Sequence, residues 1–132
     1  MTDPPSFFFD NNIPPAIADG MKAFGERVTH LQELYPGRLD IKDTEWMVDV
    51  ARGGFTVVTR DLHIKRNRLE LSEFKRHQLG GFWLGGKNRS ACEMIQQIVR
   101  NWPRMKEVAR SVGRPFIYVL PITGTKLEKF DL

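Results

Sequence analysis

Short β-prone runs alternate with longer amphipathic stretches along the chain of 132 residues. Apolar runs that are rich in Phe, Val, Ile or Trp and bounded by Gly, Pro or Asx residues predict short buried strands. Five strands are expected, at residues 6–9, 27–31, 55–58, 81–84 and 116–120. The third of these runs is continuous rather than alternating, which is typical of a strand covered on both faces.

Between these runs, apolar residues recur at helical spacing. Helices are expected over residues 14–24, 40–52, 69–77 and 91–112, the last of them interrupted near Pro103. Ser90 and Glu93 have the spacing of a capping box at the start of the last helix. Strands that alternate with helices through short connections imply right-handed crossovers and parallel pairing. The sequence therefore predicts a three-layer α/β/α sandwich with a central, mainly parallel sheet.

The composition is that of a globular protein, with 41% hydrophobic residues, three Trp and nine Phe. At this length we expect a single domain over residues 1–132, with a core at about 6–120 and a polar C-terminal tail at 121–132. No stretch approaches the ~20 apolar residues of a membrane span, and the N-terminus does not resemble a signal peptide, so a cytoplasmic location is expected. The single Cys92 excludes an internal disulfide and a cysteine-based zinc site.

The charges are distributed unevenly along the chain. Residues 1–59 carry five Lys and Arg against nine Asp and Glu, whereas residues 60–114 carry thirteen against five. Basic surface at this density favours a polyanionic partner such as nucleic acid, whose phosphates attract Lys and Arg through counterion release. The alternative is a solvated basic face without a specific partner.

Three aspartates are expected at one edge of the predicted sheet. Asp10 directly follows the first strand, Asp61 follows the third, and Asp43 opens the helix that leads back to the third strand. The carboxyl ends of parallel strands and the amino ends of the following helices share an edge, so these carboxylates should face one crevice. Like charges about 4 Å apart repel by roughly 4 kcal/mol at an effective dielectric of about 20. A cation must offset this repulsion, or one proton must be retained.

A hard divalent cation suits such a cluster, because Mg²⁺ is usually held by one or two carboxylates together with waters and a substrate phosphate. A cation so held activates a water and stabilises the leaving oxygen of a phosphodiester. We therefore assign Asp10, Asp43 and Asp61 as metal ligands and catalytic residues, with Glu45, two residues after Asp43 in the same helix, as a further catalytic carboxylate.

Each of these residues also has a purely structural interpretation. Asp10 ends a strand, Asp43 is of a preferred helix-capping type, and Asp61 has the turn propensity of a loop residue. Glu45 is equally compatible with a solvated helix position. The argument for a site rests on the convergence of these residues at one edge.

The segment Gly85-Gly86-Lys87-Asn88-Arg89-Ser90 joins a strand to a helix start at that same edge. Free backbone N–H groups and the helix dipole attract anions there, and two cationic side chains add to the attraction. A plain connector is the alternative interpretation. Contacts with the substrate are assigned to Asn11, Asn12, Thr59, Arg60, Lys87, Asn88 and Arg89.

These segments carry a resemblance to a known family. The sequence resembles the PIN-like nuclease superfamily, specifically the small PIN-like proteins allied to VapC-type toxins of toxin–antitoxin pairs. The resemblance spans about residues 6–120. It rests on Phe7-Phe8-Phe9-Asp10-Asn11-Asn12 with the Pro that follows, Asp43-Thr44-Glu45-Trp46, Val57-Val58-Thr59-Arg60-Asp61 and Phe82-Trp83-Leu84-Gly85-Gly86-Lys87-Asn88.

The resemblance implies an endoribonuclease dependent on Mg²⁺ or Mn²⁺ whose acidic cluster matches Asp10, Asp43 and Asp61. It also implies RNA as the substrate and an antitoxin as a protein partner. Apart from the resemblance, a homodimer is a further expectation. Many PIN domains carry a fourth carboxylate shortly after the third, but this sequence has Leu62 and His63 there. Glu45 is therefore the candidate substitute. Some PIN-like proteins have lost catalysis.

The leading hypothesis is a metal-dependent ribonuclease in which the basic region 60–114 positions the RNA backbone. The first alternative is a noncatalytic module of the same fold that binds nucleic acid or a protein. Its binding would weaken steeply with salt and leave the RNA intact. The second alternative is a phosphatase for small phosphate esters.

Overall fold

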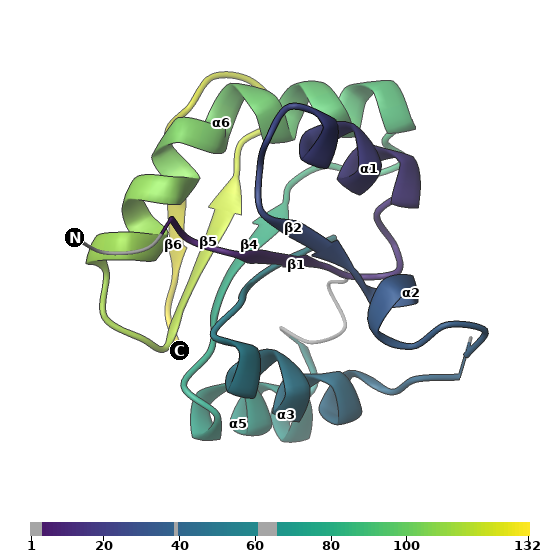
Figure 1. The fold of residues 1–132 in the computed structure, drawn as a ribbon. Helices are drawn as coiled ribbons and strands as arrows, with labels where there is room; N and C mark the ends of the chain where they lie inside the picture. Colours follow the sequence, from purple (N-terminus) through teal and green to yellow (C-terminus); the bar gives the residue numbers. More distant parts are fainter. Residues whose placement is uncertain (1–3, 39, 61–65) are drawn as a thin grey trace.

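The computed structural model describes residues 4–38, 40–60 and 66–132 (Figure 1). In these ranges a six-stranded sheet has the order β2-β1-β3-β4-β5-β6. Neighbouring strands from β2 to β5 are parallel, and β6 is antiparallel to β5. The strands are β1 (Phe7–Phe9), β2 (Val28–His30), β3 (Thr56–Thr59), β4 (Gly80–Leu84), β5 (Phe116–Leu120) and β6 (Glu128–Phe130).

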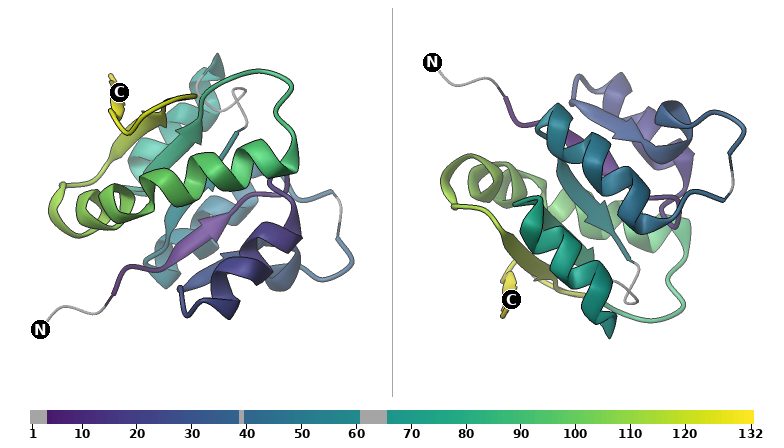
Figure 2. Two further views of the ribbon diagram at one scale, coloured as in Figure 1. Left: turned by 90° about the horizontal axis from the view of Figure 1, so that it is seen from above. Right: turned by 90° about the horizontal axis from the view of Figure 1, so that it is seen from below.

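Helices cover both faces of this sheet, as Figures 1 and 2 show. The helices are α1 (Pro15–Ala23), α2 (Leu31–Leu34), α3 (Asp43–Gly53), α5 (Arg68–Arg76) and α6 (Ala91–Ser111). One face is packed by α1 and α6, and the other by α3 and α5. The predicted three-layer α/β/α sandwich with a mainly parallel sheet is thereby confirmed.

The strand β1 explains how the two cores are built. Phe7 and Phe9 point into the core beneath α1 and α6, whereas Phe8 points into the core beneath α3 and α5. The Phe7 ring centroid lies 4.4 Å from that of Trp102, and the Phe8 centroid lies 5.0 Å from that of Trp46. Because successive strand residues face opposite sides, a central strand covered by helices on both sides must be apolar at every position.

The interruption predicted near Pro103 is wrong, because α6 runs continuously from Ala91 to Ser111 with this proline inside it. A proline within a helix costs about 3 kcal/mol through the lost hydrogen bond and a steric clash. Ile98 and Trp102 before the proline and Met105 at the next turn are all buried in the same core. Burying each such side chain contributes about 1.5–3 kcal/mol, so continuous packing outweighs the local cost.

Two short elements were not expected from the sequence. The helix α2 is capped by His30, whose ring Nδ1 accepts a hydrogen bond from the Gln32 N–H at 3.1 Å. The strand β6 lies in the segment predicted as a polar tail and pairs Glu128 with Val119. Within the described residues, no helix combines the length and apolar character needed to cross a bilayer.

An ion pair fastens α6 to the segment that precedes β2. Lys106 Nζ lies 2.9 Å from Glu26 Oε1, and both side chains are mostly buried. The hydrogen bond from Lys106 lowers the pKa of Glu26 below its ordinary value. A carboxyl whose pKa is lowered by folding contributes stability above its unfolded-state pKa, and this contribution is lost as the pH falls through the folded-state pKa.

Replacement of Lys106 with Met is therefore expected to lower the free energy of unfolding by up to about 1 kcal/mol at pH 7. The difference from wild type should shrink as the pH falls below about 4, where the carboxyl becomes protonated. Urea denaturation at several pH values measures both effects, with the exposed Lys75→Met as the control. If Lys106→Met lowers the free energy of unfolding by the same amount at every pH, the effect is not electrostatic.

Candidate functional site

Asp10 is the first residue after β1 and is 4% exposed. Its backbone N–H donates to the Val58 carbonyl at 3.0 Å and so continues the pairing of β1 with β3. One carboxylate oxygen accepts a hydrogen bond from the Asn11 N–H at 2.7 Å, and the other accepts one from the Thr59 hydroxyl at 2.9 Å. The carboxylate is therefore held in one orientation at the carboxyl edge of the sheet.

Asn11 and Asn12 tie the loop after β1 to neighbouring elements. Asn12 Oδ1 accepts from the Arg60 N–H at 3.2 Å and also lies 3.2 Å from the Thr59 hydroxyl. Asn11 Oδ1 accepts from Gln32 Nε2 at 2.9 Å. Asn12 therefore links the end of β3 to the loop that carries Asp10. The two segments are neighbours because β1 and β3 pair in parallel.

Asp43 is the first residue of α3, and Lys42 occupies the N-cap position without a side-chain cap. The Trp46 indole N–H donates to Asp43 Oδ1 at 3.0 Å. The Asp43 side chain therefore does not cap the helix, which was the structural alternative for this residue. Since Trp46 is fully buried, it holds the Asp43 carboxylate from within the core.

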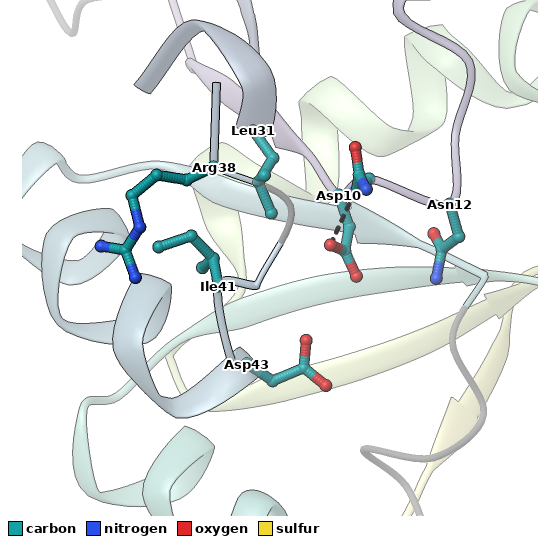
Figure 3. Close-up of a pocket in the computed structure, with 7 residues that line it drawn as sticks. Asp10, Asn12, Leu31, Arg38, Ile41 and Asp43 are labelled. Carbon is teal, nitrogen blue, oxygen red and sulfur yellow. Dashed lines mark hydrogen bonds between the residues drawn. The ribbon is translucent and has the colours of Figure 1, made fainter. Parts of the chain in front are cut away.

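The side chains of Asp10 and Asp43 meet in one hollow of about 290 Å³ (Figure 3). They come from segments far apart in the sequence, at the end of β1 and at the start of α3. The hollow is lined by Asp10, Asn11, Asn12, Leu31, Arg38, Ile41 and Asp43. Two of the three aspartates predicted to share a crevice therefore do so. Asp61, the third, lies outside the described residues.

The donor set of this hollow fits a hard divalent cation. Carboxylate and amide oxygens are the ligands that Mg²⁺ accepts, and one or two protein carboxylates are the usual number. Asp10 and Asp43 supply two carboxylates, and hydrogen bonds from the Asn11 N–H, the Thr59 hydroxyl and the Trp46 indole orient them. Within residues 4–38, 40–60 and 66–132, no group of three His, Cys, Asp or Glu side chains is placed to hold a metal ion.

Glu45 is an exposed residue on α3, and it does not line the hollow. Its carboxylate Oε2 lies 3.5 Å from Arg38 Nη2, and Arg38 is one of the lining residues. The structure therefore links Glu45 to the rim through an ion pair with Arg38. Asp49, further along α3, accepts a hydrogen bond from the Tyr35 hydroxyl instead.

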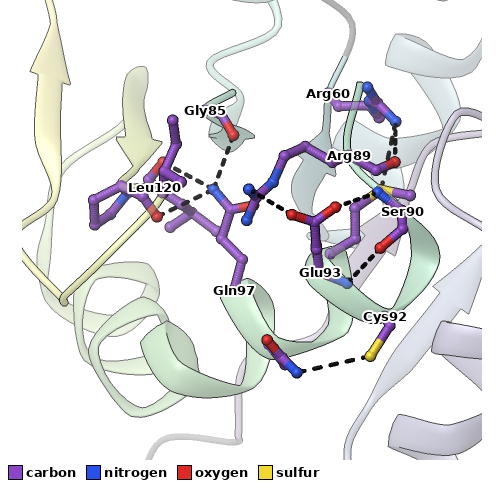
Figure 4. A network of polar contacts seen from close by, with 12 residues as sticks. Arg60, Gly85, Arg89, Ser90, Cys92, Glu93, Gln97 and Leu120 are labelled. Carbon is purple, nitrogen blue, oxygen red and sulfur yellow. Dashed lines mark hydrogen bonds and ion pairs between the residues drawn. The ribbon is translucent and has the colours of Figure 1, made fainter. Parts of the chain in front are cut away.

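The loop from Gly85 to Ser90 lies at the same edge, between β4 and α6 (Figure 4). Arg60, which follows β3, reaches it, with Nη1 3.4 Å from the Arg89 carbonyl. Lys87 and Asn88 are exposed, whereas Arg89 is mostly buried and pairs with Glu93 at 3.2 Å. Lys87 and Asn88 are therefore the side chains of this loop that a substrate can reach from solvent.

Ser90 and Glu93 form the predicted capping box at the start of α6. The Glu93 N–H donates to Ser90 Oγ at 3.1 Å, and the Ser90 N–H donates to Glu93 Oε1 at 3.0 Å. The hydrogen bonds from Ser90, backbone first and then side chain, and the charge of Arg89 lower the pKa of Glu93. The capping box thereby fixes the end of the basic loop.

Gln97 and His30 support this edge and were missed from the sequence. Gln97 is fully buried, and its Nε2 lies 3.1 Å from the carbonyl oxygens of Gly85, Leu120 and Pro121. The signal for it was a polar residue beside Ile98 on a mostly apolar helix face. His30 Nε2 lies 2.6 Å from the Ile13 carbonyl and so fixes the loop after β1.

Comparisons with known proteins identify a family for the part of the chain that contains this edge. A family model described as a PIN-like domain matches residues 5–86, which run from just before β1 to just after β4. The matched segment contains both Asp10 and Asp43. No curated protein and no solved structure matches the chain.

Proposed function

Since this chain belongs to the family of PIN-like domains, we propose that it is a metal-dependent endoribonuclease. Domains of this family are commonly nucleases. The observation that carries the proposal is the meeting of two carboxylates, Asp10 and Asp43, in one hollow at the carboxyl edge of a parallel sheet. This edge is where open α/β sheets bind their ligands.

In this proposal Asp10, Asp43 and Asp61 hold a Mg²⁺ or Mn²⁺ ion. A bound divalent cation supplies Lewis acidity, which activates water and neutralises charge on the scissile phosphate. The protein contributes orientation, because the Asn11 N–H and the Thr59 hydroxyl hold the Asp10 carboxylate from one side. Trp46 fixes Asp43 on the other side.

The substrate backbone would follow the basic side of the same edge. Arg60 lies between the Asp10 loop and the loop from Gly85 to Ser90, with contacts to both. Lys87 and Asn88 are exposed on that second loop. Cations in this position attract phosphates and add no preference for base sequence. Arg89 acts through the loop it stabilises, because its guanidinium pairs with Glu93.

The experiment that tests this function is RNA cleavage by the purified full chain. Structured and unstructured RNAs are incubated with Mn²⁺, with Mg²⁺ and with chelator, and the products are resolved on a denaturing gel. Cleavage in one or both cations that disappears in chelator is expected. RNA that stays intact in both cations at all protein concentrations would refute the proposal.

We further propose that the chain is the toxin of a toxin–antitoxin pair, with an antitoxin as its protein partner. The support is the resemblance carried by the segments around Asp10, Asp43 and the loop from Gly85. Induced expression of the chain should then arrest growth, and Asp10→Asn should relieve the arrest at equal protein level. Unimpaired growth with the wild-type chain at that level would contradict a toxin role.

A noncatalytic nucleic-acid or protein-binding module is the second candidate function. The observation in its favour is that Glu45, the candidate substitute for a fourth carboxylate, is exposed and paired with Arg38 instead of lining the hollow. This candidate predicts RNA binding that weakens with salt, is indifferent to divalent cations and leaves the RNA intact.

Lys87 provides a prediction shared by both candidates. Replacement of Lys87 with Gln removes an exposed charge from the basic loop. RNA affinity, measured in chelator by fluorescence anisotropy, should fall several-fold at low salt. The slope of log affinity against log salt should decrease by about 0.7, the value for one phosphate contact on a single strand.

The matched control is Lys75→Gln, which removes the same charge from the exposed surface near the end of α5. The C-terminal end of this helix lies toward the opposite edge of the sheet, because the helix runs back before β4. The salt slope should stay unchanged in this variant. If the salt slope changes equally in both variants, RNA affinity depends on the overall charge of the protein and not on a contact made by Lys87.

A further inference from the structure

A second hollow lies at the amino edge of the sheet, opposite the edge of Asp10. It has a volume of about 390 Å³ and forms where β2 and β3 begin and where α3 and α6 end. Figure 1 shows the start of β1 and the end of α6 on the same side of the molecule, away from α2. Arg27, Arg110 and Arg114 line it, and we call it the arginine hollow.

Arg114 is fixed at one wall of the arginine hollow. Its Nη1 donates to the Phe55 carbonyl at 2.9 Å, and its Nη2 donates to Thr56 Oγ1 at 2.6 Å. Burial lowers the pKa of this guanidinium, which means that its charged form lacks solvent. A guanidinium has five N–H donors, and the acceptors of these two hydrogen bonds are neutral. A charged acceptor would therefore satisfy Arg114 better than its present partners.

The other two arginines add charge that no carboxylate of the described residues offsets. Arg27 donates from Nη1 to the Pro4 carbonyl at 3.2 Å, and Arg110 is exposed in the last turn of α6. Within the described residues, none of the three arginines forms an ion pair, and no Asp or Glu lines the hollow. Glu26, the acidic neighbour of Arg27, is neutralised by Lys106.

Arginines near helix C-termini also have a structural explanation, because they complement the helix dipole. Each helix end carries only about half a negative charge, so the ends of α3 and α6 offset about one of the three positive charges. Counted over the described residues, the hollow thus keeps an excess of about two positive charges. Gly54 also lines it, and apart from its chain neighbours no atom of another residue lies within 4 Å of the position that a Cβ would take there, so this wall of the hollow is open.

We propose that the arginine hollow binds the phosphate group of a nucleotide. Guanidinium groups match phosphate oxygens in geometry and charge, and Pro4 and Pro5 give the hollow an apolar rim against which a sugar or base can pack. The nucleotide is either free or part of a nucleic-acid strand. The inference does not depend on cleavage at Asp10, because the two sites lie at opposite edges of the sheet.

The test is an NMR titration of the ¹⁵N-labelled full chain in chelator at low salt. The probes are adenosine 5′-monophosphate and a short single-stranded oligonucleotide. Amide shifts of Gly54 and Arg110 report on the arginine hollow, and the shift of Asn11 reports on the edge of Asp10. The variants are Arg110→Gln and, as a matched control on the exposed surface of the same helix, Arg104→Gln.

At least one probe should shift Gly54 saturably. Arg110→Gln should weaken this binding about tenfold or more, the loss expected for one charge-assisted hydrogen bond, and Arg104→Gln less than about twofold. Saturation by the mononucleotide identifies a free nucleotide as the ligand, and saturation by the oligonucleotide alone identifies a strand. No shift of Gly54 with either probe, or equal weakening by both variants, would overturn the proposal.

Discussion

Asp10→Asn is expected to reduce metal-dependent RNA cleavage at least about a hundredfold. Removing one well-placed electrostatic group from an active site commonly costs about 10²–10³ in rate. The asparagine oxygen can still accept a hydrogen bond from the Asn11 N–H or the Thr59 hydroxyl, so the local structure is preserved. The substitution removes the negative charge that holds the cation. Initial rates at saturating Mn²⁺ measure the effect.

Asp19→Asn is the matched control for this experiment. Asp19 is an exposed carboxylate on α1, and it does not line the hollow of Asp10 and Asp43. Cleavage by this variant should equal that of wild type. Cleavage by Asp10→Asn at the wild-type rate would contradict the site. A urea denaturation curve for each variant separates lost chemistry from lost folding.

The meeting of Asp10 and Asp43 was predictable from the sequence because it depends on topology alone. Parallel strands put all their carboxyl ends at one edge, and the helix that begins with Asp43 leads back to β3 from that edge. The run Phe7-Phe8-Phe9 marks a strand buried on both faces, so Asp10 must leave the core at its end. No side-chain detail is needed for this inference.

The partners of these side chains were not predictable in the same way. The ion pair of Arg38 with Glu45 joins the loop before α3 to the helix itself, and its geometry depends on the path of that loop. The continuity of α6 through Pro103 depends on packing against the sheet, which local propensity does not contain. The strand β6 forms because the edge of β5 offers free backbone groups, although its own residues are mostly polar.

The sequence shows Gln97 as a polar residue on a mainly apolar helix face, but only the fold reveals its structural role. A polar residue between Met94 and Ile98 interrupts the apolar face of α6. Its side chain faces the carboxyl ends of β4 and β5, where Nε2 lies within hydrogen-bond distance of the Gly85 and Leu120 carbonyl oxygens. The amide thereby holds the first residue of the basic loop, Gly85, against Leu120.

Replacement of Gln97 with Leu is expected to destabilise the protein by about 2–3 kcal/mol. A leucine fills similar space but donates no hydrogen bond, so buried carbonyl oxygens at the ends of β4 and β5 lose a donor. The Leu120 carbonyl still accepts a hydrogen bond from the Gly85 N–H, so the loss of stability is smaller than if this carbonyl lost every donor. The free energy of unfolding from urea denaturation measures this change.

The neighbouring Gln96→Leu separates this role from a general effect of the substitution. Gln96 is exposed on α6, and its one side-chain hydrogen bond among the described residues is to Cys92 Sγ at 3.7 Å. Its replacement should change stability by less than about 0.5 kcal/mol. If both substitutions cost the same, Gln97 does not hold the strand ends. If Gln97→Leu alone is costly, the loop from Gly85 that carries Lys87 is anchored by a buried amide, and RNA affinity should fall with stability in that variant.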